Sequence, residues 1–90
     1  MQDFRLLRAW QAACALSLAV YAATRRFPPD ERFGLTAQPR RAVVSIQANI
    51  AEGCGRRSNR DFAQFIQVAI ASACEAESHL QLSTGLGFLP

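Results

Sequence analysis

The sequence predicts an all-α protein, folded as an antiparallel up-and-down bundle of three helices. Helix-favouring residues dominate three segments, at about 3–26, 37–52 and 59–84, and prolines or glycines that end helices separate them. In the last segment, apolar residues recur at spacings of three and four, which is the period of a helix with one buried face. A chain of 90 residues is long enough for a single domain, residues 1–90, and too short for two independent ones.

The first helix is expected from about Asp3 to Arg26, because this segment contains neither glycine nor proline. Between Ala12 and Ala23 the only polar side chain is Ser17, so no face of the helix is suited to water for three turns. Such a helix has to be covered on nearly all sides. The prolines at 28 and 29 then end it.

The second helix is expected from about Ala37 to Glu52, with Thr36 as its cap and Pro39 in its first turn, where a missing amide costs little. One face carries a polar stripe that we interpret as an ordinary solvated face: Gln38, Arg41, Ser45, Asn49 and Glu52. Arg40 and Gln47 lie seven residues apart on the otherwise apolar side, so they need partners there or face a subunit boundary.

The third helix is expected to follow a stop at Gly53 and Gly55, since glycine tolerates the left-handed end of a helix. Ser58 is the expected cap, with Asp61 in the position of a capping box. The helix should reach about Thr84 and bury one apolar stripe, which consists of Phe62, Phe65, Ile66, Ala69, Ile70, Ala73, Ala76 and Leu80.

Arginine supplies all ten basic residues, against seven acids, so the net charge is +3. Residues 36–61 hold five of these arginines and two acids, whereas residues 62–90 hold Glu75 and Glu77 and no arginine. The planar guanidinium suits bidentate phosphate contacts, but a GC-rich genome also favours arginine codons. Both explanations stay open, and the mild positive charge permits nucleic-acid binding without requiring it.

The sequence has three cysteines, an odd number, and they are widely spaced: Cys14, Cys54 and Cys74. Neither a disulfide framework nor a zinc site is therefore predicted. This pattern is typical of a reducing cytoplasm. The apolar run at 12–23 follows two arginines, as in a secretory signal, but it continues in helical register and is too short to span a bilayer. We therefore expect a cytoplasmic protein with no membrane partner.

Candidate phosphate contacts are concentrated between the second and third helices, where the chain reads NIAEGCGRRSNRDF at 49–62. Arg56, Arg57 and Arg60 come to the amino end of a helix, whose free amides and partial positive charge attract anions. In the alternative interpretation these arginines are solvated or paired with Glu52 and Asp61, which contributes only about 0–1 kcal/mol.

No catalytic residue, metal site or cofactor is predicted. His79 is the only histidine, and a helix pair with Glu75, one turn away, is favoured over a catalytic role. Gly53 and Gly55 follow a helix and lack the rest of a nucleotide-binding fingerprint. Cys54 is interpreted as a small filler and not as a reactive thiol.

Three stretches resemble a known family: DFRLLRAWQAA at 3–13, FPPDERFGL at 27–35 and AQPRRAVVSIQANIAEGCGRRSNRDFAQF at 37–65. They are similar to the four-helix-bundle proteins encoded in intervening sequences of bacterial 23S rRNA genes, and the resemblance extends from Phe4 to about Leu89. Relatives include the accessory variability determinant of diversity-generating retroelements, a basic pentameric barrel implicated in binding nucleic acid and a reverse transcriptase.

The resemblance implies three helices of a four-helix-bundle plan, since family members continue into a fourth helix that this chain lacks after Pro90. It also implies a homo-oligomer, a pentamer by analogy with the relatives. The resulting hypothesis is a non-enzymatic protein that associates with RNA or DNA through five arginines, namely Arg40, Arg41, Arg56, Arg57 and Arg60. The alternative is a structural scaffold or a module that docks a protein partner, with arginines that only solubilise it.

Overall fold

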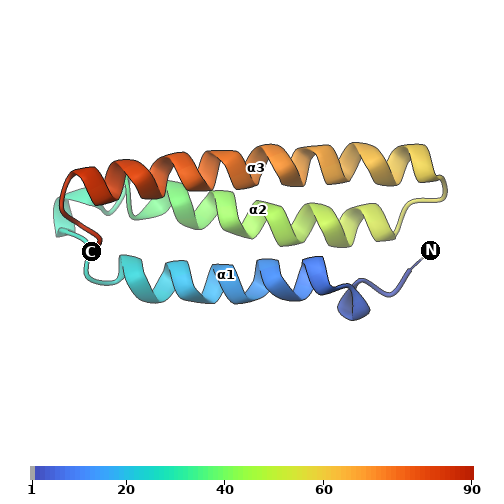
Figure 1. The fold of residues 1–90 in the computed structure, drawn as a ribbon, viewed down its shortest axis with the longest axis horizontal. Coiled ribbons are helices and arrows are strands. Elements are labelled where there is room, and N and C mark those ends of the chain that lie inside the picture. The colour runs from blue at the N-terminus through green and yellow to red at the C-terminus, as the bar shows by residue number, and fades with distance from the viewer. Residues whose placement is uncertain (1) are drawn as a thin grey trace.

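The computed structural model describes residues 2–90 and confirms the all-α fold class. In this part of the chain there is no strand, and three helices lie antiparallel: α1 (Arg8–Thr24), α2 (Ala37–Cys54) and α3 (Asn59–Gly85) (Figure 1). Two short 3-10 helices, η1 (Phe4–Leu6) and η2 (Pro29–Glu31), precede α1 and α2. The described chain is elongated, with extents of 43 × 19 × 19 Å.

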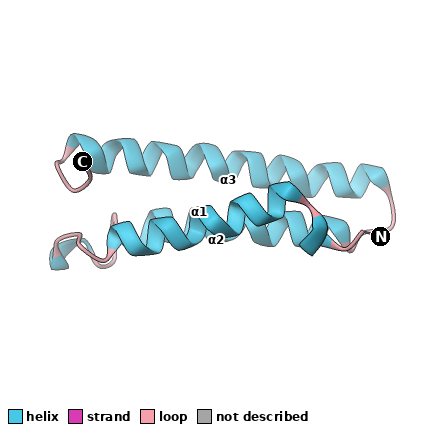
Figure 2. Cartoon of the chain, turned by 60° about the horizontal axis from the view of Figure 1, so that its bottom comes forward, coloured by secondary structure: helices cyan, strands magenta, loops and turns pink. Residues whose placement is uncertain are grey.

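The middle helix, α2, holds the bundle together. It packs along both α3 and α1, whereas α1 and α3 make no comparable contact with each other (Figure 2). The buried core is centred on α2 and is built from Ala13, Val20, Ala42, Val43, Ile46, Ile50, Ala69 and Ala76. Small residues at several of these positions allow the helix backbones to approach closely.

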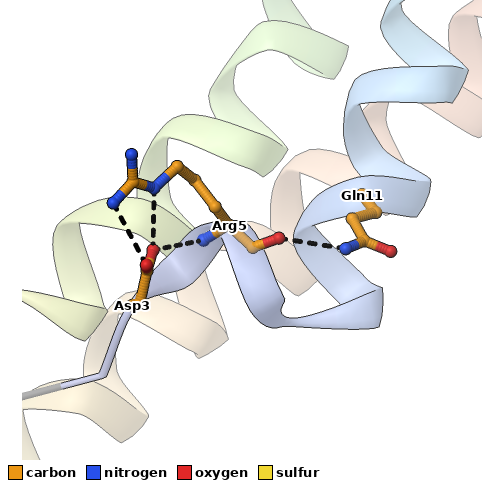
Figure 3. Close-up of polar contacts among 3 residues, drawn as sticks. All are labelled: Asp3, Arg5 and Gln11. Carbon is orange, nitrogen blue, oxygen red and sulfur yellow. Dashed lines mark hydrogen bonds and ion pairs between the residues drawn. The ribbon is translucent and has the colours of Figure 1, made fainter.

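The first helix is shorter than its composition predicts. The expected start at Asp3 is wrong, because Leu7 takes an extended conformation (ψ 128°) that separates η1 from α1. The Asp3 carboxylate instead accepts hydrogen bonds from the backbone amide and the guanidinium of Arg5, and Gln11 Nε2 donates to the Arg5 carbonyl at 2.9 Å (Figure 3). These local contacts fix a separate turn ahead of α1.

The two ends of α2 also differ from the expectation. Thr36 has helical dihedral angles and its side chain caps nothing, because the preceding turn already supplies helical bonds such as Gln38 N to Gly34 O at 2.9 Å. At the other end α2 continues through Gly53 to Cys54, and Gly55 has φ −84°, so no left-handed glycine ends this helix. Gly53 serves packing instead: a Cβ there would lie 3.1 Å from the Cβ of Phe65.

Both ends of α3 follow the local signals in the sequence. Ser58 Oγ accepts from the Asp61 amide at 3.1 Å, which confirms the predicted cap. At the C-terminal end, Gly87 has φ 83°, its amide binds the Thr84 carbonyl, and the Phe88 amide binds the Ser83 carbonyl at 2.9 Å. These bonds form a Schellman motif.

The polar stripe of α2 is only partly a solvated face. Arg41 and Glu52 are exposed and Gln38 is half-buried, but the centre of the stripe faces α3. There Ser45 and Ser72 share a hydrogen bond of 2.9 Å between their hydroxyls, and Asn49 Nδ2 donates to the Ser45 carbonyl at 2.8 Å. The solvated-face interpretation is therefore wrong for the middle of the stripe, which satisfies its polar groups inside the helix interface.

Arg40 and Gln47 have partners on the apolar side of α2, which was the first of the two alternatives expected from the sequence. Arg40 Nε donates to Thr24 Oγ1 at 2.7 Å, and Trp10 Nε1 donates to Gln47 Oε1 at 3.2 Å. Both bonds join α2 to α1, one near each end of α1. They hold the two helices in register.

Candidate functional site

The five predicted arginines form two separate groups at opposite ends of α2. Arg40 and Arg41 lie in its first turns, and Arg56, Arg57 and Arg60 lie in the turn to α3 and at the start of α3. Arg40 and Arg56 are separated by most of α2, and the helix from Arg40 to Cys54 alone spans about 21 Å at 1.5 Å per residue. The structure therefore does not gather the five into one site. The second group is called the turn cluster below.

The turn cluster is fully on the surface, and its members differ in their partners. Arg56 Nη2 lies 3.1 Å from Glu52 Oε2, and its guanidinium lies over the Phe65 ring at 4.5 Å from the centroid. Within residues 2–90, neither Arg57 nor Arg60 has a carboxylate within 4 Å. The alternative of charge pairing thus holds for Arg56 alone.

A small pocket of about 140 Å³ lies beside the turn cluster, between the start of α3 and the N-terminal segment. Arg56 and Arg57 line it, and the Gln2 amide donates to the Cys54 carbonyl at 3.3 Å on one side. Cys54 itself is buried and unpaired. That environment agrees with a filler role for this cysteine.

A larger pocket of about 470 Å³ lies at the other end, where α1 ends and α2 begins. Arg40 and Arg41 line it together with three residues that sequence reasoning missed, Tyr21, Arg32 and Phe33. The Arg40 guanidinium lies 4.5 Å from the centroid of the Tyr21 ring, and that of Arg32 lies 5.2 Å from the centroid of the Phe33 ring. We call these five residues the aromatic–arginine pocket. The only sign of this pocket in the sequence was Phe33, an aromatic residue in a polar loop.

An apolar groove runs between α1 and α3. It consists of two hollows of about 350 and 410 Å³, and Leu16 and Ala73 line both, so the groove is continuous. Ile46 and Ile50 of α2 form part of its lining, and Ile70 of α3 forms one side. Residues 2–90 therefore do not supply the covering that the composition of α1 requires: Leu16 is exposed, and Leu18 is 75% exposed.

The remaining chemistry of the described residues is sparse. His79 Nε2 lies 3.1 Å from Glu75 Oε2, as the helix spacing predicted. No three His, Cys, Asp or Glu side chains among residues 2–90 are grouped so that they could hold a metal ion. None of the helices in that range has the length and apolar character needed to cross a membrane.

One pair of ionisable groups shows a clear shift, and it lies outside both arginine groups. Hydrogen bonds from the Arg5 side chain and backbone amide hold the pKa of Asp3 below its ordinary value. The same contact raises the pKa of Arg5. This is the pattern of an exposed structural ion pair and not of a catalytic acid.

Comparison with known protein families identifies the family of this chain. The family model described as 23S rRNA-intervening sequence protein matches residues 5–90, nearly the whole of the chain. No curated protein matches it.

Proposed function

Since the chain belongs to the 23S rRNA-intervening sequence protein family, we propose that it is a non-enzymatic, homo-oligomeric helical bundle that associates with nucleic acid through its arginines. The observation that carries this proposal is the excess of arginines without a carboxylate partner. Of the ten arginines, only Arg5 and Arg56 lie within 4 Å of a carboxylate among the described residues. The other eight have no carboxylate partner among the described residues, and guanidinium groups bind phosphate through two parallel hydrogen bonds.

The phosphate contacts in this proposal are Arg40, Arg41 and the turn cluster. Arg41, Arg57 and Arg60 are exposed and reach solvent from two ends of the bundle. Because α2 holds the two groups about 20 Å apart or more, a nucleic-acid strand has to span at least that distance to contact both. A single chain at +3 binds weakly at physiological salt, so the proposal also needs several copies.

Self-association is supported by the groove between α1 and α3. Apolar side chains line it, and exposed contiguous apolar surface of this kind marks an interaction site. Copies of the same chain are the proposed cover, in a pentamer by analogy with relatives of the family. Five copies at +3 carry +15, and linked weak sites bind far more tightly than one.

A second candidate, a scaffold that docks a different protein, is favoured by the same groove. In that case the arginines only keep the assembly soluble. Both candidates place the protein in the cytoplasm, since the free state of Cys14, Cys54 and Cys74 suits a reducing compartment.

The nucleic-acid proposal is tested by titrating labelled RNA and labelled duplex DNA at several salt concentrations. R56A/R57A is compared with R25A/R26A, which removes the same charge from another exposed pair. The first variant should reduce the slope of log Kd against log salt by about 1.4–1.8, because each lost phosphate contact accounts for about 0.7–0.9. If R56A/R57A and the wild type have equal slopes and affinities, the turn cluster is not part of the nucleic-acid site. If the wild type binds neither probe, the scaffold remains as the candidate function.

A further inference from the structure

The aromatic–arginine pocket brings three arginines and two aromatic rings together around one hollow. Tyr21 comes from the last turns of α1, Arg32 and Phe33 come from the loop, and Arg40 and Arg41 come from α2. Its volume of about 470 Å³ falls within the range of about 300–1,000 Å³ that is usual for small-molecule sites. It is a hollow built by three parts of the chain, and not a single exposed helix end.

The charge in this pocket is positive and uncompensated. Arg32, Arg40 and Arg41 have no carboxylate within 4 Å in the described chain, and no acidic residue lines the pocket. The acid nearest in sequence, Glu31, does not line the pocket, and its Oε1 accepts a hydrogen bond from the Leu35 amide at 3.0 Å. Three guanidinium groups around one hollow favour an anion, and a phosphate is the anion that their fork geometry fits best.

The flat surfaces in the pocket point to a planar group beside that anion. Phe33 is 81% exposed, the largest exposed fraction among the large apolar side chains of the described residues. Aromatic rings and guanidinium planes are the groups on which proteins stack unpaired bases. The pocket offers both, in the pairs Arg32 with Phe33 and Arg40 with Tyr21.

Arg40 is held in place before any ligand arrives. Its Nε donates to Thr24 Oγ1 at 2.7 Å and its Nη2 donates to the Tyr21 carbonyl at 3.2 Å, while its plane lies over the Tyr21 ring. A fixed guanidinium loses little side-chain freedom on binding. In the turn cluster, Arg56 is likewise held, by Glu52 and over the Phe65 ring, whereas no side-chain hydrogen bond of Arg57 or Arg60 is present within the described chain.

We infer that the aromatic–arginine pocket binds one unpaired nucleotide of a single-stranded nucleic acid, with the base against Phe33 and the guanidinium planes and the phosphate on Arg32 and Arg41. This inference rests on the proposed function and specifies its ligand. A base within a duplex has no free face to offer, so the pocket selects single strands. The turn cluster, with its exposed cations and small hollow, contacts phosphates of either form.

The test measures the binding of a labelled 12-nucleotide oligo(U) and of a labelled 12-base-pair duplex to the full chain at one salt concentration. The variants are F33A and F33L, with L6A as the matched control, since Leu6 is 77% exposed, lies ahead of α1, and lines neither the pocket nor the groove. F33A and F33L should weaken oligo(U) binding by about 5- to 150-fold, the range of one base–aromatic stack, and change duplex binding less than twofold. L6A should change neither.

The outcomes separate this inference from the proposed function. If the wild type binds oligo(U) and F33A binds it with the same affinity, the pocket is not the nucleotide site, and the proposed function still stands. An equal loss for oligo(U) and duplex overturns the selection of unpaired bases. No binding of either probe by the wild type overturns both proposals.

Discussion

Thr24 and Arg40 are joined by a hydrogen bond of 2.7 Å from the Arg40 Nε to the Thr24 Oγ1, at a point where Thr24 is only 1% exposed. The same hydroxyl donates to the Val20 carbonyl at 2.7 Å, so it serves α1 and α2 at once. Without it, the half-buried guanidinium of Arg40 keeps only its bond to the Tyr21 carbonyl. This contact ties the end of α1 to the start of α2.

Replacing Thr24 by valine should lower the free energy of unfolding by about 1–2 kcal/mol, because the shape is kept while an acceptor for a charged donor is lost. Urea denaturation at a fixed protein concentration measures the change. T24S, which keeps the hydroxyl, is the control and should lose less. A T24V protein as stable as the wild type would show that water replaces the hydroxyl at no cost.

Gly53 should resist substitution although it lies inside a helix, where alanine is normally better by about 1 kcal/mol. An added Cβ would meet the Phe65 Cβ at 3.1 Å and the Phe62 carbonyl oxygen at 3.4 Å, so α2 and α3 would have to separate. We expect G53A to be destabilised by about 1–2 kcal/mol in urea or thermal unfolding.

Two other glycines provide the controls for G53A. Gly85 also lies in a helix but has nothing within 4 Å of a new Cβ, so G85A should be neutral or more stable by up to about 1 kcal/mol. A Cβ added at Gly87 would also meet no atom within 4 Å, but this residue has a φ of 83°. G87A should therefore lower the free energy of unfolding by about 1 kcal/mol through backbone strain alone. If G53A is as stable as G85A, then α2 and α3 do not approach each other at Gly53 as closely as the structure shows.

The number, type and order of the helices could be predicted from the sequence because the signals are local. Residues 28–29 interrupt the helical pattern, and Ser58 caps α3. The apolar period of the third segment reflects one apolar face, in which Ala69 and Ala76 are buried while Ile70 stays 52% exposed beside the groove. The start of α1 could not be predicted in this way. It depends on the extended conformation of Leu7 and on the bonds around Asp3, which composition does not record.

The candidate site was predictable in part, for a related reason. Runs of arginine are visible in the sequence, and so Arg40, Arg41 and the turn cluster could be named. Tyr21 and Phe33 could not, because they meet Arg40 and Arg32 only when the loop after α1 folds back toward α2. The partners of Ser45 and Gln47 were hidden in the same way, since Ser72 and Trp10 are distant in sequence.

The turn ahead of α1 should depend on pH through Asp3. Its folded pKa is below the unfolded value, so the contact stabilises the fold above the unfolded pKa and is lost as the pH falls through the folded pKa. An NMR titration of the Asp3 carboxyl should give a pKa lower than that of a model peptide, and R5Q should raise it toward the peptide value. An Asp3 pKa that R5Q leaves unchanged would show that Arg5 is not the cause.

Ile70 should control self-association, because it lines the groove between α1 and α3 and is 52% exposed in a single chain. I70E places a charge there, and a charge buried in an interface without a partner costs several kcal/mol, so assembly should weaken by at least about tenfold. V68E is the matched control: Val68 lies on the same helix, is 48% exposed and does not line the groove. Sedimentation velocity at micromolar concentration separates the species. A wild-type chain that sediments as a single copy, or an I70E chain that assembles as V68E does, would show that copies of this protein do not cover the groove.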